Sequence, residues 1–101
     1  MHHLLVNNLS EIQNLCRKYS VQSLFAFGSV LTADFGPNSD IDLLVTFTPS
    51  SSSGAFSRFF GFKDALEKLF KRPVDLVSSR AIANPYFKQQ IEFTKAALYA
   101  A

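Results

Sequence analysis

Apolar residues recur at helical spacing near the start of the chain and again in its second half. Between residues 9 and 19 they follow a period of three to four, at Leu9, Ile12, Leu15, Cys16 and Tyr19. A second helical pattern, rich in phenylalanine, runs from Phe56 to about Lys71. Both patterns predict amphipathic helices that pack one apolar face on the body of the protein.

Three shorter segments have the pattern of β-strands. Ser23–Phe27 and Val74–Val77 are short and mostly apolar. The clearest strand runs from Asp40 to Phe47, where Ile41, Leu43, Val45 and Phe47 form one apolar face that should lie on the core. The opposite face of this strand begins with Asp40 and Asp42, although aspartate is depleted in strands.

The connections and the final helix complete the pattern. Gly28-Ser29 turns the chain after the first strand, and residues 30–33 could form one helical turn with exposed N–H groups. Residues 34–39 and the serine-rich residues 48–54 read as surface loops. Pro85 can begin a last helix, which we expect to continue to Leu98 with its aromatic residues facing the body. The order predicts an α/β (α+β) protein with one domain over residues 1–101.

Composition narrows the class of protein. At 48% hydrophobic and 18% charged residues the chain is typical of a globular protein, and a net charge of +2 is too small to indicate a nucleic-acid-binding surface. The single cysteine, Cys16, excludes an internal disulfide and is expected to be a buried, inert thiol. No apolar run is long enough to span a bilayer and no leader opens the chain, so we expect a cytoplasmic protein. His2 and His3 are too few to indicate a metal site.

The candidate functional residues are three aspartates, Asp40, Asp42 and Asp75. Residues i and i+2 of a strand project from one face, so Asp40 and Asp42 can converge on one cation. Asp75 lies within another predicted strand and could join them if the two strands are close together. Three such carboxylates could hold two Mg²⁺ ions about 3.5–4 Å apart, an arrangement suited to in-line displacement at phosphorus. The Gly28-Ser29 turn could bind the phosphates of a nucleoside triphosphate through backbone N–H groups and a hydroxyl.

Each element also has a simpler interpretation. An isolated Asp-x-Asp is typical of solvated residues at a strand edge, and Gly-Ser after a strand is usually only a turn. Asp75 could form a surface ion pair with Arg72 or Arg80. The combination is far more specific: Gly-Ser, ten residues, Asp-x-Asp in a strand, and an aspartate in a further strand.

This combination resembles the minimal nucleotidyltransferase domain of the DNA polymerase beta-like superfamily. Gly28-Ser29 matches the Gly-Ser motif of that family, Asp40 and Asp42 match its metal-binding aspartates, and Asp75 matches its third carboxylate. The resemblance covers nearly the whole chain and implies a short mixed sheet flanked by helices. It also implies a two-metal Mg²⁺ site and transfer of a nucleoside monophosphate, AMP from ATP, to a hydroxyl. Asp75 would accept the hydroxyl proton, and Gly28 and Ser29 would bind the β- and γ-phosphates.

The same resemblance implies a protein partner, and this sequence departs from the family's pattern at one place. Small domains of this kind act as antitoxins that adenylylate a helical HEPN-type ribonuclease. The family commonly carries basic residues soon after Gly-Ser, but residues 30–34 are Val-Leu-Thr-Ala-Asp and contain none. Binding of the triphosphate would then need a cation from elsewhere, such as Arg58, Lys63 or Arg80. The alternative hypothesis is a binding module of the same fold that only sequesters its partner. The sequence does not decide whether the chain forms homo-oligomers.

Overall fold

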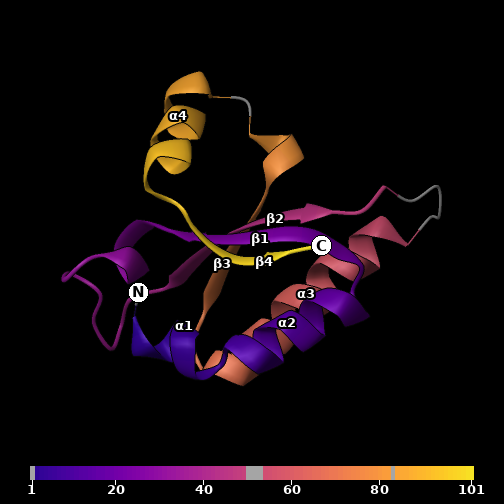
Figure 1. Cartoon of the computed structure of the whole chain (residues 1–101), viewed down its shortest axis with the longest axis horizontal. Coiled ribbons are helices and arrows are strands. Elements are labelled where there is room, and N and C mark those ends of the chain that lie inside the picture. The colour runs from indigo at the N-terminus through magenta and orange to yellow at the C-terminus, as the bar shows by residue number, and fades with distance from the viewer. Residues whose placement is uncertain (1, 50–53, 83) are drawn as a thin grey trace.

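Four strands form one mixed sheet in the order β3-β2-β1-β4. The computed structural model describes residues 2–49, 54–82 and 84–101. β1 (Val21–Phe27) pairs antiparallel with both β2 (Ile41–Phe47) and β4 (Ala96–Ala100), whereas β2 pairs parallel with β3 (Val74–Ser78). The predicted mixed sheet flanked by helices is therefore confirmed, and β4 joins it as an additional strand (Figure 1).

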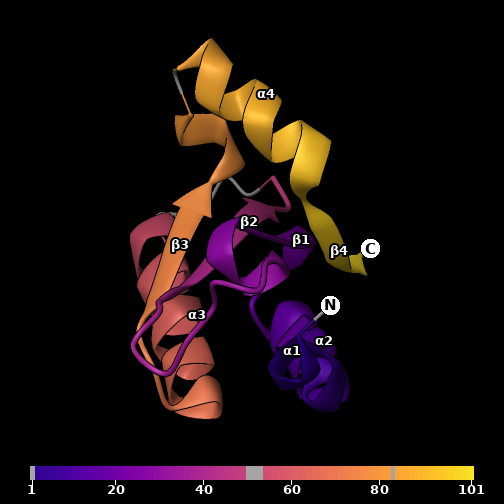
Figure 2. The same ribbon diagram turned by 90° about the vertical axis from the view of Figure 1, so that its left-hand side faces the viewer.

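The main core lies between the sheet and the N-terminal and central helices. α1 (His3–Asn7), α2 (Leu9–Lys18) and α3 (Ala55–Phe70) cover the same face of the sheet (Figures 1 and 2). Ile41, Leu43 and Val45 are fully buried on this face, as the alternation in β2 predicts. Cys16 is also fully buried, and this burial raises the pKa of its thiol to about 12, which agrees with an inert cysteine.

α4 (Pro85–Thr94) covers the opposite face of the sheet and stands above the strands in Figure 1. A small cluster of Phe27, Leu44 and Ile91 holds this helix to the sheet. Leu44 lies two residues after Asp42 in β2, so both side chains project from the face that α4 covers. Asp42 therefore lies on the side of the sheet away from the main core.

The end of the chain differs from the expected long helix. α4 ends at Thr94, Lys95 is extended, and residues 96–100 form β4 against the free edge of β1. Leu98 is buried as predicted, but from a strand rather than a helix. Tyr86 and Phe93, expected to face the body, are 79% and 87% exposed. The backbone groups of β1 need hydrogen-bond partners on both sides, and this requirement outweighs the helical propensity of an alanine-rich segment.

The connections contain two short 3₁₀ helices. One covers Gly28–Leu31, slightly before the helical turn expected at residues 30–33, and the other covers Ser79–Ala81. Residues 50–53 of the predicted serine-rich loop, and residue 83, lie outside the described residues. Within the part of the chain that is described, no helix is both long enough and apolar enough to cross a membrane.

Candidate active site at the ends of β1, β2 and β3

Gly28 and Asp42 lie against each other where β1 ends and β2 begins. Phe27 at the end of β1 pairs with Asp42, so Gly28 follows directly beside that aspartate. Gly28 has a φ of +73°, a left-handed conformation that glycine adopts without steric cost. A Cβ added here would overlap Asp42 Oδ2 and would lie 3.2 Å from Asp42 Cγ. The missing side chain of Gly28, in the predicted phosphate turn, therefore leaves room for the carboxylate of Asp42, the predicted metal ligand.

Asp42 and Asp75 form a pair across two neighbouring strands. They are direct partners in the parallel register of β2 and β3, so their side chains project from the same face. Burial, the charge of Asp75, a side-chain hydrogen bond with Asp75 and the charge of Asp40 together raise the pKa of Asp42 to about 6. Two of the three predicted carboxylates are thus brought together by strand register alone.

Asp40 is held less firmly. It precedes the first residue of β2 and is exposed, so no ladder pairing orients it. Within residues 2–49, 54–82 and 84–101, no three His, Cys, Asp or Glu side chains are grouped closely enough to hold a metal ion together. The structure therefore has a carboxylate pair with Asp40 near it, in place of the compact group of three that the sequence suggested.

The pair carries negative charge without a neutralising partner in the described residues. The ion pairs found there are Lys63–Glu67, Lys68–Asp64 and Lys95–Glu92, and none involves the three aspartates. The alternative interpretation of Asp75 as the acid of an ion pair with Arg72 or Arg80 is therefore not supported. Carboxylate oxygens are the ligands that Mg²⁺ prefers, and Mg²⁺ commonly takes only one or two of them together with substrate phosphates. The donor set of Asp42 and Asp75 fits that chemistry.

The three cations suggested for the phosphates lie elsewhere. Arg58 donates to the carbonyl of Thr48 and lies over the ring of Phe47, at the other end of β2 from Asp42. Lys63 is paired with Glu67 on α3. Arg80 lies in the 3₁₀ helix that follows the far end of β3.

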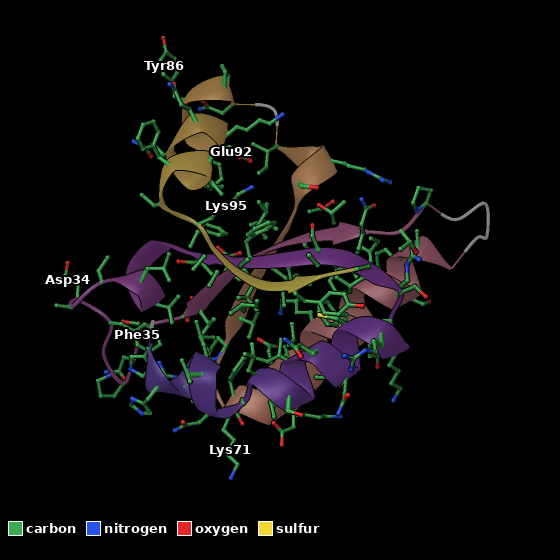
Figure 3. All side chains as sticks on the ribbon, viewed as in Figure 1. Asp34, Phe35, Lys71, Tyr86, Glu92 and Lys95 are labelled. Carbon is green, nitrogen blue, oxygen red and sulfur yellow. The ribbon has the colours of Figure 1, made fainter. Side chains whose placement is uncertain are left out.

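A lysine that the sequence did not single out lies on the same side of the sheet as Asp42. Lys95 Nζ is 4.0 Å from the centre of the Phe25 ring and 2.9 Å from Glu92 Oε1. Phe25 projects from the same face of β1 as Phe27, the strand partner of Asp42. Figure 3 shows Lys95 between α4 and the sheet. Only the unexpected end of α4 and the presence of β4 place this lysine here, so the helical pattern could not indicate it.

Arg72 ties the loop before Asp40 to the start of β3. Its Nη1 donates to the carbonyls of Gly36 and Ser39, at 3.2 and 3.1 Å, and its guanidinium lies 4.6 Å from the centre of the Phe35 ring. Ser39 immediately precedes Asp40, and Arg72 is close in sequence to Asp75. This one side chain therefore links the segment that carries Asp40 to the segment that carries Asp75. Its long-range contacts have no signal in the local sequence.

This chain is similar to known proteins in its sequence and in its fold. The family model "Polymerase beta, Nucleotidyltransferase" matches residues 10–101. A proposed protein adenylyltransferase of Methanocaldococcus jannaschii is 35% identical over 95 residues, which cover 86% of this chain and 94% of that protein. The solved structure of a proposed minimal nucleotidyltransferase superposes with a TM-score of 0.78 at 29% identity, covering 95% of each chain.

A further likeness is to a chain from the crystal structure of a toxin–antitoxin pair with AMP-PNP. The TM-score is 0.72 and the identity 25%, and the match covers 93% of this chain and 74% of that one. The family match over residues 10–101 spans most of the chain, and the relative at 35% identity is matched over 86% of it. This chain belongs to the polymerase beta-like nucleotidyltransferase family.

Proposed function

We propose that this protein is a Mg²⁺-dependent adenylyltransferase that moves AMP from ATP to a hydroxyl group of a partner protein. The observation that carries the proposal is the in-register pair of Asp42 and Asp75 beside the left-handed Gly28. The adenylyltransferase name of the Methanocaldococcus relative supports the choice of reaction. The AMP-PNP and the toxin–antitoxin assembly of the solved relative support ATP as donor and the toxin of such a pair as partner. The HEPN type of that toxin is what the family resemblance implies.

The residues divide the work by position. Asp42, Asp75 and Asp40 would hold Mg²⁺, which when bound neutralises charge on the phosphates. The backbone at Gly28 and the hydroxyl of Ser29 would bind the outer phosphates. The acceptor oxygen attacks the α-phosphorus, the bond from that phosphorus to the β-bridging oxygen breaks, and pyrophosphate leaves. Asp75, whose side chain is exposed to solvent, would accept the proton of the acceptor hydroxyl.

Transfer of label from ATP tests the reaction directly. We expect the wild-type protein, with Mg²⁺ and ATP labelled at the α-phosphate, to label a HEPN-type partner. Asp42→Asn and Asp75→Asn should each reduce labelling by at least a hundredfold. Asp64→Asn is the matched control, because Asp64 is an exposed aspartate of α3 that pairs with Lys68. Equal labelling by Asp42→Asn and wild type would refute the proposed site.

A binding module without activity is the second candidate. It is favoured by the absence of basic residues at positions 30–34 and by the placement of Arg58, Lys63 and Arg80 away from Asp42. Such a module predicts that wild type and Asp42→Asn bind the partner equally while neither transfers label. Calorimetric titration with Mg²⁺ and AMP-PNP separates the two candidates, since only the enzyme should bind the nucleotide.

A further inference from the structure

The outer face of α4 exposes aromatic side chains that no described residue covers. Tyr86 is 79% exposed and Phe93 is 87% exposed, one near each end of the helix. Figure 3 shows Tyr86 pointing away from the sheet at the tip of α4. A shallow hollow on this face is lined by Tyr86, Gln89, Gln90, Phe93 and Thr94. Large exposed aromatic residues that are grouped in this way indicate an interaction surface.

The spacing of this face is symmetric about its centre. Tyr86 and Phe93 are seven residues apart, so they lie on one side of the helix, and Gln89 and Gln90 lie between them. Reading the four positions in reverse gives the same order: aromatic, amide, amide, aromatic. A second α4 laid antiparallel across the first would place Tyr86 of each copy against Phe93 of the other. The central glutamines would then face each other, where their amides can exchange hydrogen bonds.

Charge also favours a copy of the same chain. The residues of the hollow are all uncharged, although the whole chain carries a net charge of +2. Lys88 and Glu92 project from another side of α4 by helical spacing, and Glu92 is paired with Lys95 at 2.9 Å. Two copies can therefore meet along this face without bringing like charges into contact.

The area available is sufficient for a weak dimer. Aromatic side chains bury roughly 150–250 Å² each, so four fully buried rings give about 600–1,000 Å². The glutamines and Thr94 bring the total to about 1,000 Å² or more, which reaches the lower limit for a specific interface. We propose that the outer face of α4 is a homodimer interface in which Tyr86 and Phe93 of one copy pack against Phe93 and Tyr86 of a second copy. This proposal does not depend on the enzymatic activity.

Sedimentation of the purified chain across a range of concentrations tests the interface. We expect a reversible dimer that dissociates in the micromolar range. Phe93→Ser and Tyr86→Ser should each raise the dissociation constant at least tenfold. At protein concentrations below the dissociation constant neither should lower the melting temperature, because both side chains are exposed in the single chain. Phe56→Ser is the matched control, since Phe56 is an equally exposed aromatic residue, at 75%, on α3. A monomer at every concentration, or a dimer disrupted by Phe56→Ser but not by Phe93→Ser, would overturn the proposal.

Cross-linking tests the antiparallel geometry separately. Residue 90 lies next to the proposed two-fold axis, so Gln90→Cys should form a disulfide-linked dimer on mild oxidation. The native Cys16 is fully buried and should not compete. Asn14→Cys, at an exposed position of α2, gives the background rate of disulfide cross-linking by random collision. Cross-linking of Gln90→Cys no faster than Asn14→Cys would contradict the antiparallel arrangement. Binding of a different protein to this face, with the free chain monomeric, would contradict the dimer itself.

Discussion

Replacing Gly28 by alanine should destabilise the protein through two separable effects. The φ of +73° places an alanine in the left-handed region, at a cost of about 1–2 kcal/mol. The new Cβ would also overlap Asp42 Oδ2 and lie 3.2 Å from Asp42 Cγ. Turning that carboxylate away from its preferred rotamer costs about 0.5–1.5 kcal/mol. We therefore expect Gly28→Ala to lower the free energy of unfolding by about 1.5–3.5 kcal/mol, or the melting temperature by roughly 6–28 °C.

A double-mutant cycle separates the two effects. Urea unfolding would be measured for wild type, Gly28→Ala, Asp42→Ala and the double variant. Asp42→Ala removes the atoms that the new Cβ meets first, so Gly28→Ala should then cost only the backbone part. The difference between the two backgrounds is the coupling free energy, which we expect to be about 0.5–1.5 kcal/mol.

Two results would refute this reasoning. An equal cost of Gly28→Ala in both backgrounds would mean that Gly28 and the Asp42 carboxylate are not in contact. A cost below about 0.5 kcal/mol would mean that Gly28 is not left-handed in solution. Gly36→Ala is the control, because a Cβ at Gly36 meets nothing within 4 Å. It should be nearly neutral.

Three other predictions follow from the same structure. Folding favours the protonated form of Asp42, because the fold raises the pKa of this carboxyl from 3.8 to about 6. In EDTA, the free energy of unfolding of wild type should therefore fall by about 1 kcal/mol relative to that of Asp42→Asn as the pH rises from 4 to 7, after allowance for partial exposure of the carboxyl. A constant difference in stability between the two proteins at all pH values would contradict this. Arg72→Gln should weaken Mn²⁺ binding several-fold in titration, and Arg72→Lys should restore part of that binding. Arg17→Gln should leave Mn²⁺ binding unchanged, because it removes an arginine of α2 that bonds to Asn14 and lies near the Tyr99 ring of β4. Leu98→Ala should lower the free energy of unfolding, measured by chemical denaturation, by about 2–4 kcal/mol, because β4 places Leu98 in the core. Phe56→Ala, at an exposed site of α3, should have a much smaller effect.

The sequence predicts the centre of the fold because its local patterns and its tertiary contacts agree there. The alternation in β2 gives the buried face of Ile41, Leu43 and Val45, and the same alternation places Asp42 on the other face. The position of Asp75 in a third strand is also visible in the sequence. Which residue of β2 it meets is not, because register depends on how α3 returns the chain to the sheet.

The end of the chain could not be predicted in the same way. Tyr86, Ile91, Phe93 and Leu98 have acceptable helical spacing, and alanine at 96 and 97 favours a helix. The competing signal is the unpaired edge of β1, which exists only after the sheet has formed. The same limit applies to Arg72, whose hydrogen-bond acceptors lie more than thirty residues away in the sequence.

The pairing of Asp42 with Asp75 has a consequence for insertions and deletions. Catalytic residues on loops usually tolerate changes in the length of neighbouring segments. Here both side chains lie on paired strands, so one residue added between α3 and β3 would shift the register and turn position 75 toward the main core. The turn at residues 71–73 carries none of the three aspartates, yet its length determines whether the carboxylates of Asp42 and Asp75 meet. In natural or designed variants of this protein, the length of that turn should therefore vary much less than its sequence.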